Sequence, residues 1–225
     1  MADLSDYQRE FIDFLIHSDV LTFGAFTTKS GRETPYFINT GNFNSGPRIA
    51  AAGRYYANHI VEKGLSAIDT VFGPAYKGIP LAVATATALC TDHGIDVGFS
   101  FDRKEEKAHG DKGQIVGRQL EAGQRIVLVE DVITAGTTFR SIIPLIQGIA
   151  AVEFAGIVIS VDRCERGTGT ASAIDELSET MGIPIFPIVT IHDIRAYLSE
   201  PNASGLTLSS SLQDRIDAYL AAYGV

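Results

Sequence analysis

The fold is decided by one stretch of the sequence, Val127-Leu128-Val129-Glu130-Asp131-Val132-Ile133-Thr134-Ala135-Gly136-Thr137-Thr138. Its apolar start predicts a buried β-strand that ends in two adjacent acids, Glu130 and Asp131. The small and hydroxylated residues that follow predict a turn that opens a helix over 137–149. Backbone N–H groups, threonine hydroxyls and the helix dipole at such a turn can hold a phosphate monoester. The acids suit hydroxyl groups beside that phosphate, so the stretch predicts binding of a ribose 5-phosphate moiety. An ordinary acidic turn before a capped helix is the alternative.

The same order of strand, loop and helix is repeated on both sides of this stretch. The predicted strands cover 70–72, 97–101, 125–129, 154–161 and 183–189, and the predicted helices cover 47–63, 79–90, 137–149, 171–181 and 212–223. Uniformly apolar strands that alternate with helices imply an α/β fold with a parallel sheet covered on both faces. Ligands of such sheets bind at the carboxyl ends of the strands, which places every unusual loop at one edge of the sheet.

The first 45 residues follow a different pattern. Ser5 and Gln8 form a capping box before an apolar stripe, which predicts an N-terminal helix. Two short β-type segments over 23–28 and 36–39 follow, joined by a turn. Near the other end of the chain, the serine-rich segment 201–211 is predicted to be a surface loop.

Composition excludes several classes of protein. The chain has 225 residues, 45% of them hydrophobic, which is enough for one large domain with its own core. Its net charge of −9 argues against a nucleic-acid scaffold, which would normally present a basic face. The apolar stretches are shorter than a membrane span, and the acidic N-terminus lacks the features of a signal peptide. Cys90 and Cys164 have neither zinc nor disulfide-framework spacing, so we expect a cytoplasmic protein.

Three further segments carry a resemblance to a known family. They are Phe26-Thr27-Thr28-Lys29-Ser30-Gly31-Arg32 with Pro35-Tyr36-Phe37-Ile38-Asn39, Phe72-Gly73-Pro74-Ala75-Tyr76-Lys77-Gly78-Ile79-Pro80, and Asp102-Arg103-Lys104-Glu105-Glu106-Lys107-Ala108-His109-Gly110-Asp111. The stretch 127–138 resembles the PRPP (5-phosphoribosyl 1-diphosphate) signature of type I phosphoribosyltransferases. The three segments, together with 161–167, resemble the orotate branch of that family. Glu130 stands where many relatives have aspartate, and it keeps the charge.

The resemblance implies a fold and an activity. The fold would be a type I phosphoribosyltransferase fold, a mostly parallel central sheet flanked by helices. A small hood would be built largely from about 1–45, all within a single domain of residues 1–225. The activity would be Mg²⁺-dependent transfer of the phosphoribosyl group from PRPP to orotate N1, giving orotidine 5′-monophosphate and pyrophosphate in de novo pyrimidine biosynthesis. Mg²⁺ would be held mainly by PRPP and water, so we expect no dedicated protein metal site.

The resemblance also assigns residues to recognition of the base. The expected orotate-binding residues are Lys29, Phe37, Ile38, Thr134 and Arg163. The ring of Phe37 can stack on a planar pyrimidine. Relatives often have a second aromatic where Ile38 stands, so its contact is expected through the backbone. Arg163 ends a buried strand, where a guanidinium can pair with the carboxylate or ring oxygens of orotate. A structural salt bridge of Arg163 with Asp162 or Glu165 is the alternative.

A larger set of residues is implied for PRPP. The loop with Tyr76 and Lys77 would hold the pyrophosphate. The charge run from Arg103 would be a mobile catalytic loop, in which Lys104 serves its own subunit while the others reach the neighbouring subunit. The expected PRPP-binding residues are Lys29, Tyr76, Lys77, Arg103, Lys104, Lys107, His109, Glu130, Asp131, Val132, Ile133, Thr134, Ala135, Gly136, Thr137 and Thr138, and the expected catalytic residues are Lys107, His109, Arg103 and Asp131. Without the resemblance, Lys29 and Lys77 read as surface lysines and 103–112 as a solvated face.

The expected partners are orotate, PRPP and a second copy of the chain, with no nucleic acid and no membrane. Three other activities were weighed against this one. A type I enzyme for a purine base would share 130–138 but has no reason to share 29–39 or 103–110. A PRPP-sensing regulator that binds nucleic acid conflicts with the charge of −9. A dinucleotide oxidoreductase would need a GxGxxG motif after the first strand, which the sequence lacks.

Overall fold

A six-stranded sheet lies at the centre of the computed structural model, which describes residues 4–28, 31–103, 114–133, 136–167 and 169–225. The strand order is β5-β4-β3-β6-β7-β8. The strands are β3 (Thr70–Phe72), β4 (Gly98–Asp102), β5 (Ile115–Gly117), β6 (Arg125–Glu130), β7 (Glu153–Asp162) and β8 (Ile185–Thr190). All of them pair in parallel except the edge strand β5, which runs antiparallel to β4. The predicted α/β fold with a mostly parallel sheet is confirmed.

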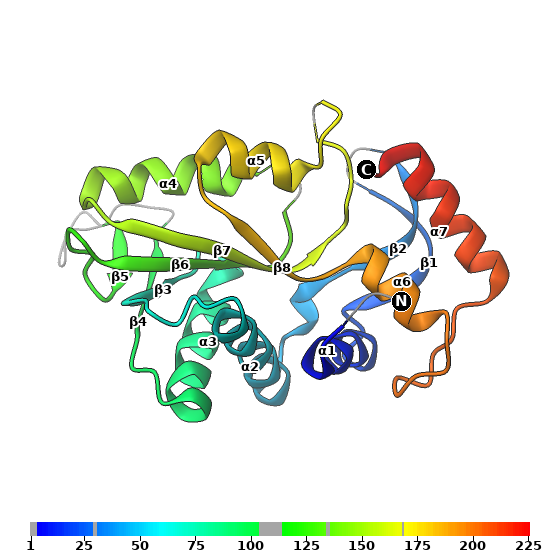
Figure 1. Ribbon diagram of the computed structural model, residues 1–225, viewed down its shortest axis with the longest axis horizontal. Coiled ribbons are helices and arrows are strands. Elements are labelled where there is room, and N and C mark those ends of the chain that lie inside the picture. Colours follow the sequence, from blue (N-terminus) through cyan, green and yellow to red (C-terminus); the bar gives the residue numbers. More distant parts are fainter. Residues whose placement is uncertain (1–3, 29–30, 104–113, 134–135, 168) are drawn as a thin grey trace.

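Helices cover both faces of this sheet (Figure 1). One face carries α4 (Thr137–Ile149) and α5 (Ala173–Met181), and the other carries α2 (Gly46–Glu62) and α3 (Gly78–His93), with α1 (Asp6–His17) beside them. Strand β6 shows why: Ile126 and Leu128 belong to the apolar cluster under α4 and α5, whereas Val127 and Val129 belong to the cluster under α2 and α3. Successive side chains of a strand point to opposite faces, so a uniformly apolar strand needs two covering layers.

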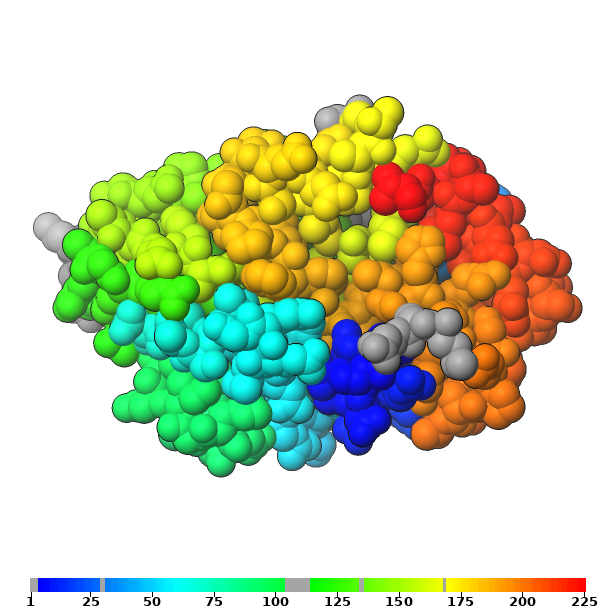
Figure 2. Space-filling model, in the orientation of Figure 1, coloured from blue at the N-terminus to red at the C-terminus, as the bar shows by residue number. Residues whose placement is uncertain are grey.

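A separate two-stranded unit lies beside one end of the sheet. Strands β1 (Leu21–Thr27) and β2 (Glu33–Ile38) form an antiparallel hairpin, and η1 (Thr40–Asn42) follows it. The last two helices are α6 (Ile191–Leu198) and α7 (Ser210–Tyr223). Helix α7 packs along the hairpin, where the rings of Tyr36 and Tyr219 meet edge to face with centroids 5.8 Å apart. In Figure 2, α7 forms the surface at one end of the molecule.

Most predicted elements are present, but β5, α6 and the short η1 were missed. The capping box of Ser5 and Gln8 begins α1 as predicted. Strand β5 was missed because three residues at a sheet edge carry too little pattern. Helix α6 was missed because it follows β8 directly, with Thr190 and Asp193 forming its capping box. The predicted loop 201–211 is irregular up to the cap of α7, but Ser210 already lies in the helix. No described helix is both long and apolar enough to cross a membrane.

Candidate active site

The carboxyl ends of four neighbouring strands meet at one edge of the sheet. Strands β3, β4, β6 and β7 are parallel, so the residues that follow Phe72, Asp102, Glu130 and Asp162 gather there. The segments singled out in the sequence therefore converge, although they are separated by tens of residues along the chain. This is the edge at which open α/β sheets bind ligands.

The loop after β6 ends at Gly136, which begins α4. Gly136 adopts the left-handed conformation at φ 66°, and an added Cβ would lie 2.7 Å from Leu177 Cδ1. The left-handed backbone conformation favours glycine at this position, and the flexible end of Leu177 would have to move to admit a side chain. Thr137 and Thr138 open the helix, whose first N–H groups have no intrahelical acceptor and so can hold an anion. Of the predicted phosphate loop, Thr134 and Ala135 lie outside the described residues.

The two acids at the end of β6 have different surroundings. Asp131 Oδ2 lies 2.8 Å from Lys77 Nζ and accepts a 2.5 Å hydrogen bond from Thr40 Oγ1. The Lys77 ammonium also lies 3.2 Å from the Thr40 hydroxyl. Glu130 is buried, and its Oε1 accepts a 3.1 Å hydrogen bond from the backbone N–H of Asp131. Asp131 therefore joins the loop after β3 to the strand end of β6.

These surroundings shift the pKa values of the two carboxyl groups in opposite directions. Burial and the adjacent Asp131 carboxylate raise the pKa of Glu130 to about 8. Burial alone would also raise the pKa of Asp131, but hydrogen bonds from Lys77 and Thr40 outweigh it and hold that pKa below its usual range. Near pH 7 and without ligand, one proton is therefore kept on Glu130, and Asp131 is the ionised member of the pair.

The loop after β3 is sharply turned. An added Cβ on Gly73 would lie 1.9 Å from the Gly78 carbonyl oxygen, so the close approach of these two backbones requires glycine. The buried Asp102 carboxylate, at the end of β4, accepts a 2.6 Å hydrogen bond from the Ala75 N–H. The Ala75–Tyr76 peptide is cis, and the side chain of Tyr76 is 71% exposed. The loop is thus anchored from below while Tyr76 and Lys77 stay accessible.

The charge run begins and ends at neighbouring points. Arg103 follows β4, and its backbone N–H donates a 2.8 Å hydrogen bond to the carbonyl of Gln114 just before the antiparallel strand β5. Lys107 and His109, which were predicted to be catalytic, and Lys104, which was predicted to bind PRPP, lie outside the described residues. The two ends of the run therefore leave the sheet beside Asp102, at the edge that carries the acid pair.

The β1–β2 hairpin presents one aromatic to solvent. Phe37 is 41% exposed, and its ring lies 5.5 Å from that of Phe26. Ile38 points the other way, into the core, so only its backbone is placed to reach a ligand. Lys29, in the turn of the hairpin, lies outside the described residues. The predicted stacking role of Phe37 is compatible with this exposure.

Arg163 follows the end of β7 and is mostly buried. Its guanidinium forms a 2.5 Å ion pair with Glu165 and lies over the Tyr36 ring, 4.8 Å from the centroid. The structural salt bridge considered for Arg163 therefore exists with Glu165. The Asp162 carboxylate instead accepts a 2.7 Å hydrogen bond from the Cys164 N–H. Burial lowers the pKa of Arg163, but Tyr36 and Glu165 outweigh this effect, so the guanidinium remains charged.

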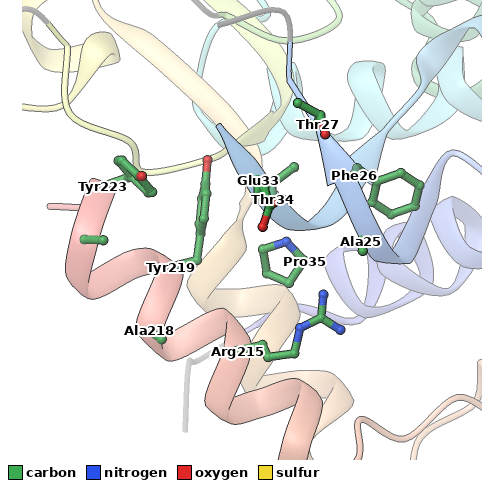
Figure 3. Close-up of a pocket in the computed structure, with 11 residues that line it drawn as sticks. Ala25, Phe26, Thr27, Glu33, Thr34, Pro35, Arg215, Ala218, Tyr219 and Tyr223 are labelled. Atoms are coloured by element: carbon green, nitrogen blue, oxygen red, sulfur yellow. The ribbon is translucent and has the colours of Figure 1, made fainter. Parts of the chain in front are cut away.

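Two hollows border these residues. One of about 130 Å³ is lined by Thr40, Lys77 and Asp131 together with apolar neighbours. A larger one of about 360 Å³ lies between the hairpin and α7, lined by Phe26, Pro35, Tyr219 and others (Figure 3). The smaller hollow contains the ion pair of Lys77 with Asp131, which joins two of the segments singled out in the sequence.

Sequence reasoning missed three residues with polar contacts in this region, Thr40, Asp102 and Tyr219, and named Glu165 only as a possible salt-bridge partner of Arg163. Thr40 and Tyr219 lie in unremarkable sequence, and no local pattern marks them. Asp102 and Glu165 lie inside the quoted motifs, but neither was given a role in ligand binding. Their position at strand ends, next to basic residues of the predicted site, was the available signal.

Comparisons with known proteins agree with this geometry. Residues 39–181 match the model of the phosphoribosyl transferase domain family. The chain is 50% identical to an orotate phosphoribosyltransferase of Chromohalobacter salexigens, over 100% of this chain and 97% of that protein. It is 46% identical to that of Clostridium acetobutylicum, over 99% and 100%. The crystal structure of an orotate phosphoribosyltransferase from Francisella tularensis superposes with a TM-score of 0.83 at 37% identity, covering 96% of this chain and 100% of that one. The chain therefore belongs to the orotate phosphoribosyltransferases, enzymes of pyrimidine biosynthesis that transfer a phosphoribosyl group to orotate.

Proposed function

We propose that the edge formed by β3, β4, β6 and β7 carries out this transfer from PRPP to N1 of orotate, with release of pyrophosphate. The observation that carries the assignment to this edge is the ion pair of Lys77 with Asp131, 2.8 Å long. It joins a cation for the pyrophosphate to the acid that receives the ribose hydroxyls. A donor of the PRPP type needs both groups within one small site, since its phosphates and its sugar hydroxyls are neighbours.

Each half of PRPP has a matching part of the site. The loop from Val132 to Thr138 and the N-terminus of α4 receive the 5′-phosphate through N–H groups and hydroxyls. Asp131 and Glu130 face the ribose hydroxyls. Tyr56 supports this position, because its hydroxyl donates a 2.7 Å hydrogen bond to the Glu130 carbonyl. The orotate ring stacks on Phe37, and the Arg163 guanidinium pairs with its carboxylate or ring oxygens.

The protein's task is alignment and charge neutralisation. The transition state at the anomeric carbon resembles an oxocarbenium ion, and the departing pyrophosphate gathers negative charge. When bound with PRPP, Mg²⁺ would supply part of the neutralisation of that charge. The donor set fits this arrangement, since Asp131 is already engaged by Lys77 and Thr40, and Glu130 keeps its proton near neutral pH. Lys77 and Tyr76 hold the pyrophosphate from the same subunit, and Arg103 reaches it from the neighbouring subunit.

We propose further that Lys104, Lys107 and His109 complete the site on a loop shared between two subunits. The active form is then a homodimer, with the β1–β2 hairpin as part of a hood over the base. Closure of such a loop would exclude water, which otherwise hydrolyses PRPP. For the compartment we propose the cytoplasm, in keeping with two cysteines that are both free thiols.

The activity is tested by following orotate absorbance with purified protein, PRPP and Mg²⁺, with adenine, hypoxanthine and uracil in parallel. A rate that requires orotate and Mg²⁺ is expected. Turnover of a purine instead would keep the PRPP site and overturn the roles of Phe37 and Arg163. Binding of PRPP without turnover of any base would point to a regulator.

The shared loop is tested with two inactive variants. Lys107→Ala should lower turnover far more than PRPP affinity, because the loop acts when it closes. Mixing this variant with Lys77→Ala should restore some activity, since one mixed site then contains both lysines. No recovery after proven subunit exchange would contradict the shared loop.

A further inference from the structure

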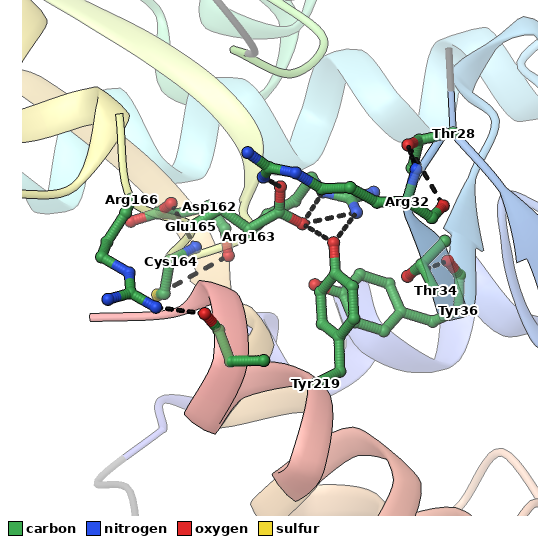
Figure 4. Close-up of polar contacts among 11 residues, drawn as sticks. Thr28, Arg32, Thr34, Tyr36, Asp162, Arg163, Cys164, Glu165, Arg166 and Tyr219 are labelled. Carbon is green, nitrogen blue, oxygen red and sulfur yellow. Dashed lines mark hydrogen bonds and ion pairs between the residues drawn. The ribbon is translucent and has the colours of Figure 1, made fainter. Parts of the chain in front are cut away.

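Glu165 connects Arg163 to the C-terminal helix α7 (Figure 4). Its Oε1 accepts a 2.8 Å hydrogen bond from Arg163 Nε and a 2.7 Å hydrogen bond from the Tyr219 hydroxyl. Arg163 Nη2 lies 2.5 Å from the same oxygen and 3.4 Å from the Tyr219 hydroxyl. The second carboxylate oxygen lies 3.8 Å from Arg32 Nη1, in the hairpin. One carboxylate thus holds groups from the hairpin, the loop after β7, and α7.

The guanidinium of Arg163 is also fixed on its flat side. It lies over the Tyr36 ring at 4.8 Å, and that ring meets the Tyr219 ring edge to face. These contacts occupy one face, Nε and Nη2. Within the described part of the chain, no hydrogen bond from Arg163 Nη1 is found, so this edge is the one available to a ligand.

We propose that Glu165 and Tyr219 are positioning residues that hold the Arg163 guanidinium in the orientation in which it reads the base. The proposal rests on the proposed contact between Arg163 and orotate, and it adds that this contact depends on α7. An arginine side chain fixed before the ligand arrives loses less conformational freedom on binding. The two cations, Arg163 and Arg32, share one carboxylate, so one positive charge remains for an anionic base.

The first test removes one hydroxyl. Tyr219→Phe keeps the ring in the groove beside Pro35 but loses the hydrogen bond to Glu165. We expect the KM for orotate to rise about five-fold, the scale of one hydrogen bond, with the KM for PRPP unchanged. In the reverse reaction, the KM for orotidine 5′-monophosphate should rise while that for pyrophosphate stays constant. Tyr223→Phe is the matched control, since Tyr223 lies one turn further along α7 and contacts Arg32 through its ring. This control should leave every constant unchanged.

The second test changes the carboxylate. Glu165→Ala should raise the KM for orotate by about thirty-fold, because it removes a charge-assisted partner. Glu165→Gln keeps an acceptor for Arg163 and Tyr219 and should restore part of the loss. If Glu165 and Tyr219 only anchor α7, both Glu165→Ala and Tyr219→Phe should instead lower the thermal midpoint or change the kinetic constants for both substrates together.

Arg163→Gln separates this inference from the proposed function. If that variant leaves the KM for orotate unchanged, the contact between Arg163 and the base is wrong. If it raises this KM but Tyr219→Phe and Glu165→Ala do not, the contact stands and the positioning role is overturned. Should Glu165→Ala fail to fold, the comparison of Tyr219→Phe with Tyr223→Phe decides.

Discussion

The raised pKa of Glu130 makes a quantitative prediction about stability. In the folded protein without ligand this pKa is about 8, against 4.5 for an unperturbed glutamate. A carboxyl with a higher pKa in the folded state favours folding most at low pH, and this contribution is lost as the pH rises from 4.5 through 8. At pH 7 the unfolded carboxyl is ionised while the folded one is still mostly protonated. The pH interval from 4.5 to 7, at about 1.4 kcal/mol per unit, corresponds to about 3 kcal/mol.

Replacing Glu130 by glutamine removes the free-energy cost of keeping this buried carboxyl protonated in the folded protein. The amide is neutral at every pH, its oxygen can accept the Asp131 N–H, and its NH₂ can donate to the Asp131 carboxylate. We therefore expect Glu130→Gln to increase the free energy of unfolding by about 3 kcal/mol at pH 7, and by less than about 1 kcal/mol at pH 5. The same variant should bind PRPP more weakly, because the neutral amide cannot ionise and so cannot offer a ribose hydroxyl the stronger, charge-assisted acceptor that a carboxylate provides.

Urea unfolding of the ligand-free protein at several pH values measures this difference. Asp131→Asn is the matched control: it removes the ionised member of the pair together with its ion pair to Lys77 and the charge-assisted hydrogen bond from Thr40, so it should destabilise the protein at pH 7. If Glu130→Gln changes the free energy of unfolding by the same amount at pH 5 and pH 7, the buried acid is not protonated and the account of the pair is refuted.

Three further predictions follow from other described residues. His59 is fully buried, its Nδ1 lies 2.8 Å from the Tyr7 hydroxyl, and burial lowers its pKa to about 4. The free energy of unfolding should therefore fall as the pH drops from 6.5 towards 4, and urea unfolding of His59→Gln should show a smaller loss over that range. Gly73→Ala should cost more than about 2 kcal/mol, whereas Gly148→Ala, a helical position with no atom near the added Cβ, should stabilise by about 0.5 kcal/mol; equal effects in thermal unfolding would contradict the backbone argument. Lys77→Met removes the hydrogen bond and the positive charge that lower the pKa of Asp131, so this pKa should rise and the acid limb of the pH profile of kcat/KM for PRPP should move to higher pH. An acid limb that does not move would show that the ionisation of Asp131 does not determine it.

The order of strands and helices could be read from the sequence because it depends on local pattern. The run Arg125–Glu130 is apolar up to its acids, and glycine follows the helices at 64 and 182, where the chain leaves the helical conformation. Such signals arise within a few residues of each other. They also locate the sheet edge, since the carboxyl ends of parallel strands must meet there.

The partners of the site residues could not be predicted in the same way. Thr40 and Asp131 are 91 positions apart, and Tyr219 and Glu165 are 54 apart. The residues that flank Thr40 and Tyr219 in the sequence form no pattern that predicts these contacts. The protonation of Glu130 depends on the same long-range packing, because burial and a paired neighbour determine it. Two adjacent acids in the sequence therefore looked equivalent, although the fold makes them different.

Strand β6 has a consequence for how substitutions combine. Its alternate residues belong to two apolar clusters that lie on opposite faces of the sheet. Cavities created at Ile142, in α4, and at Ile60, in α2, should each cost about 2–5 kcal/mol, and their energies should add, because distant sites without shared partners seldom couple. Substitutions in the apolar cluster on one face of the sheet then require no compensating changes in the cluster on the other face. Glu130 and Asp131 are the exception, because they end a strand that packs against both clusters, so a substitution in either cluster can shift their position.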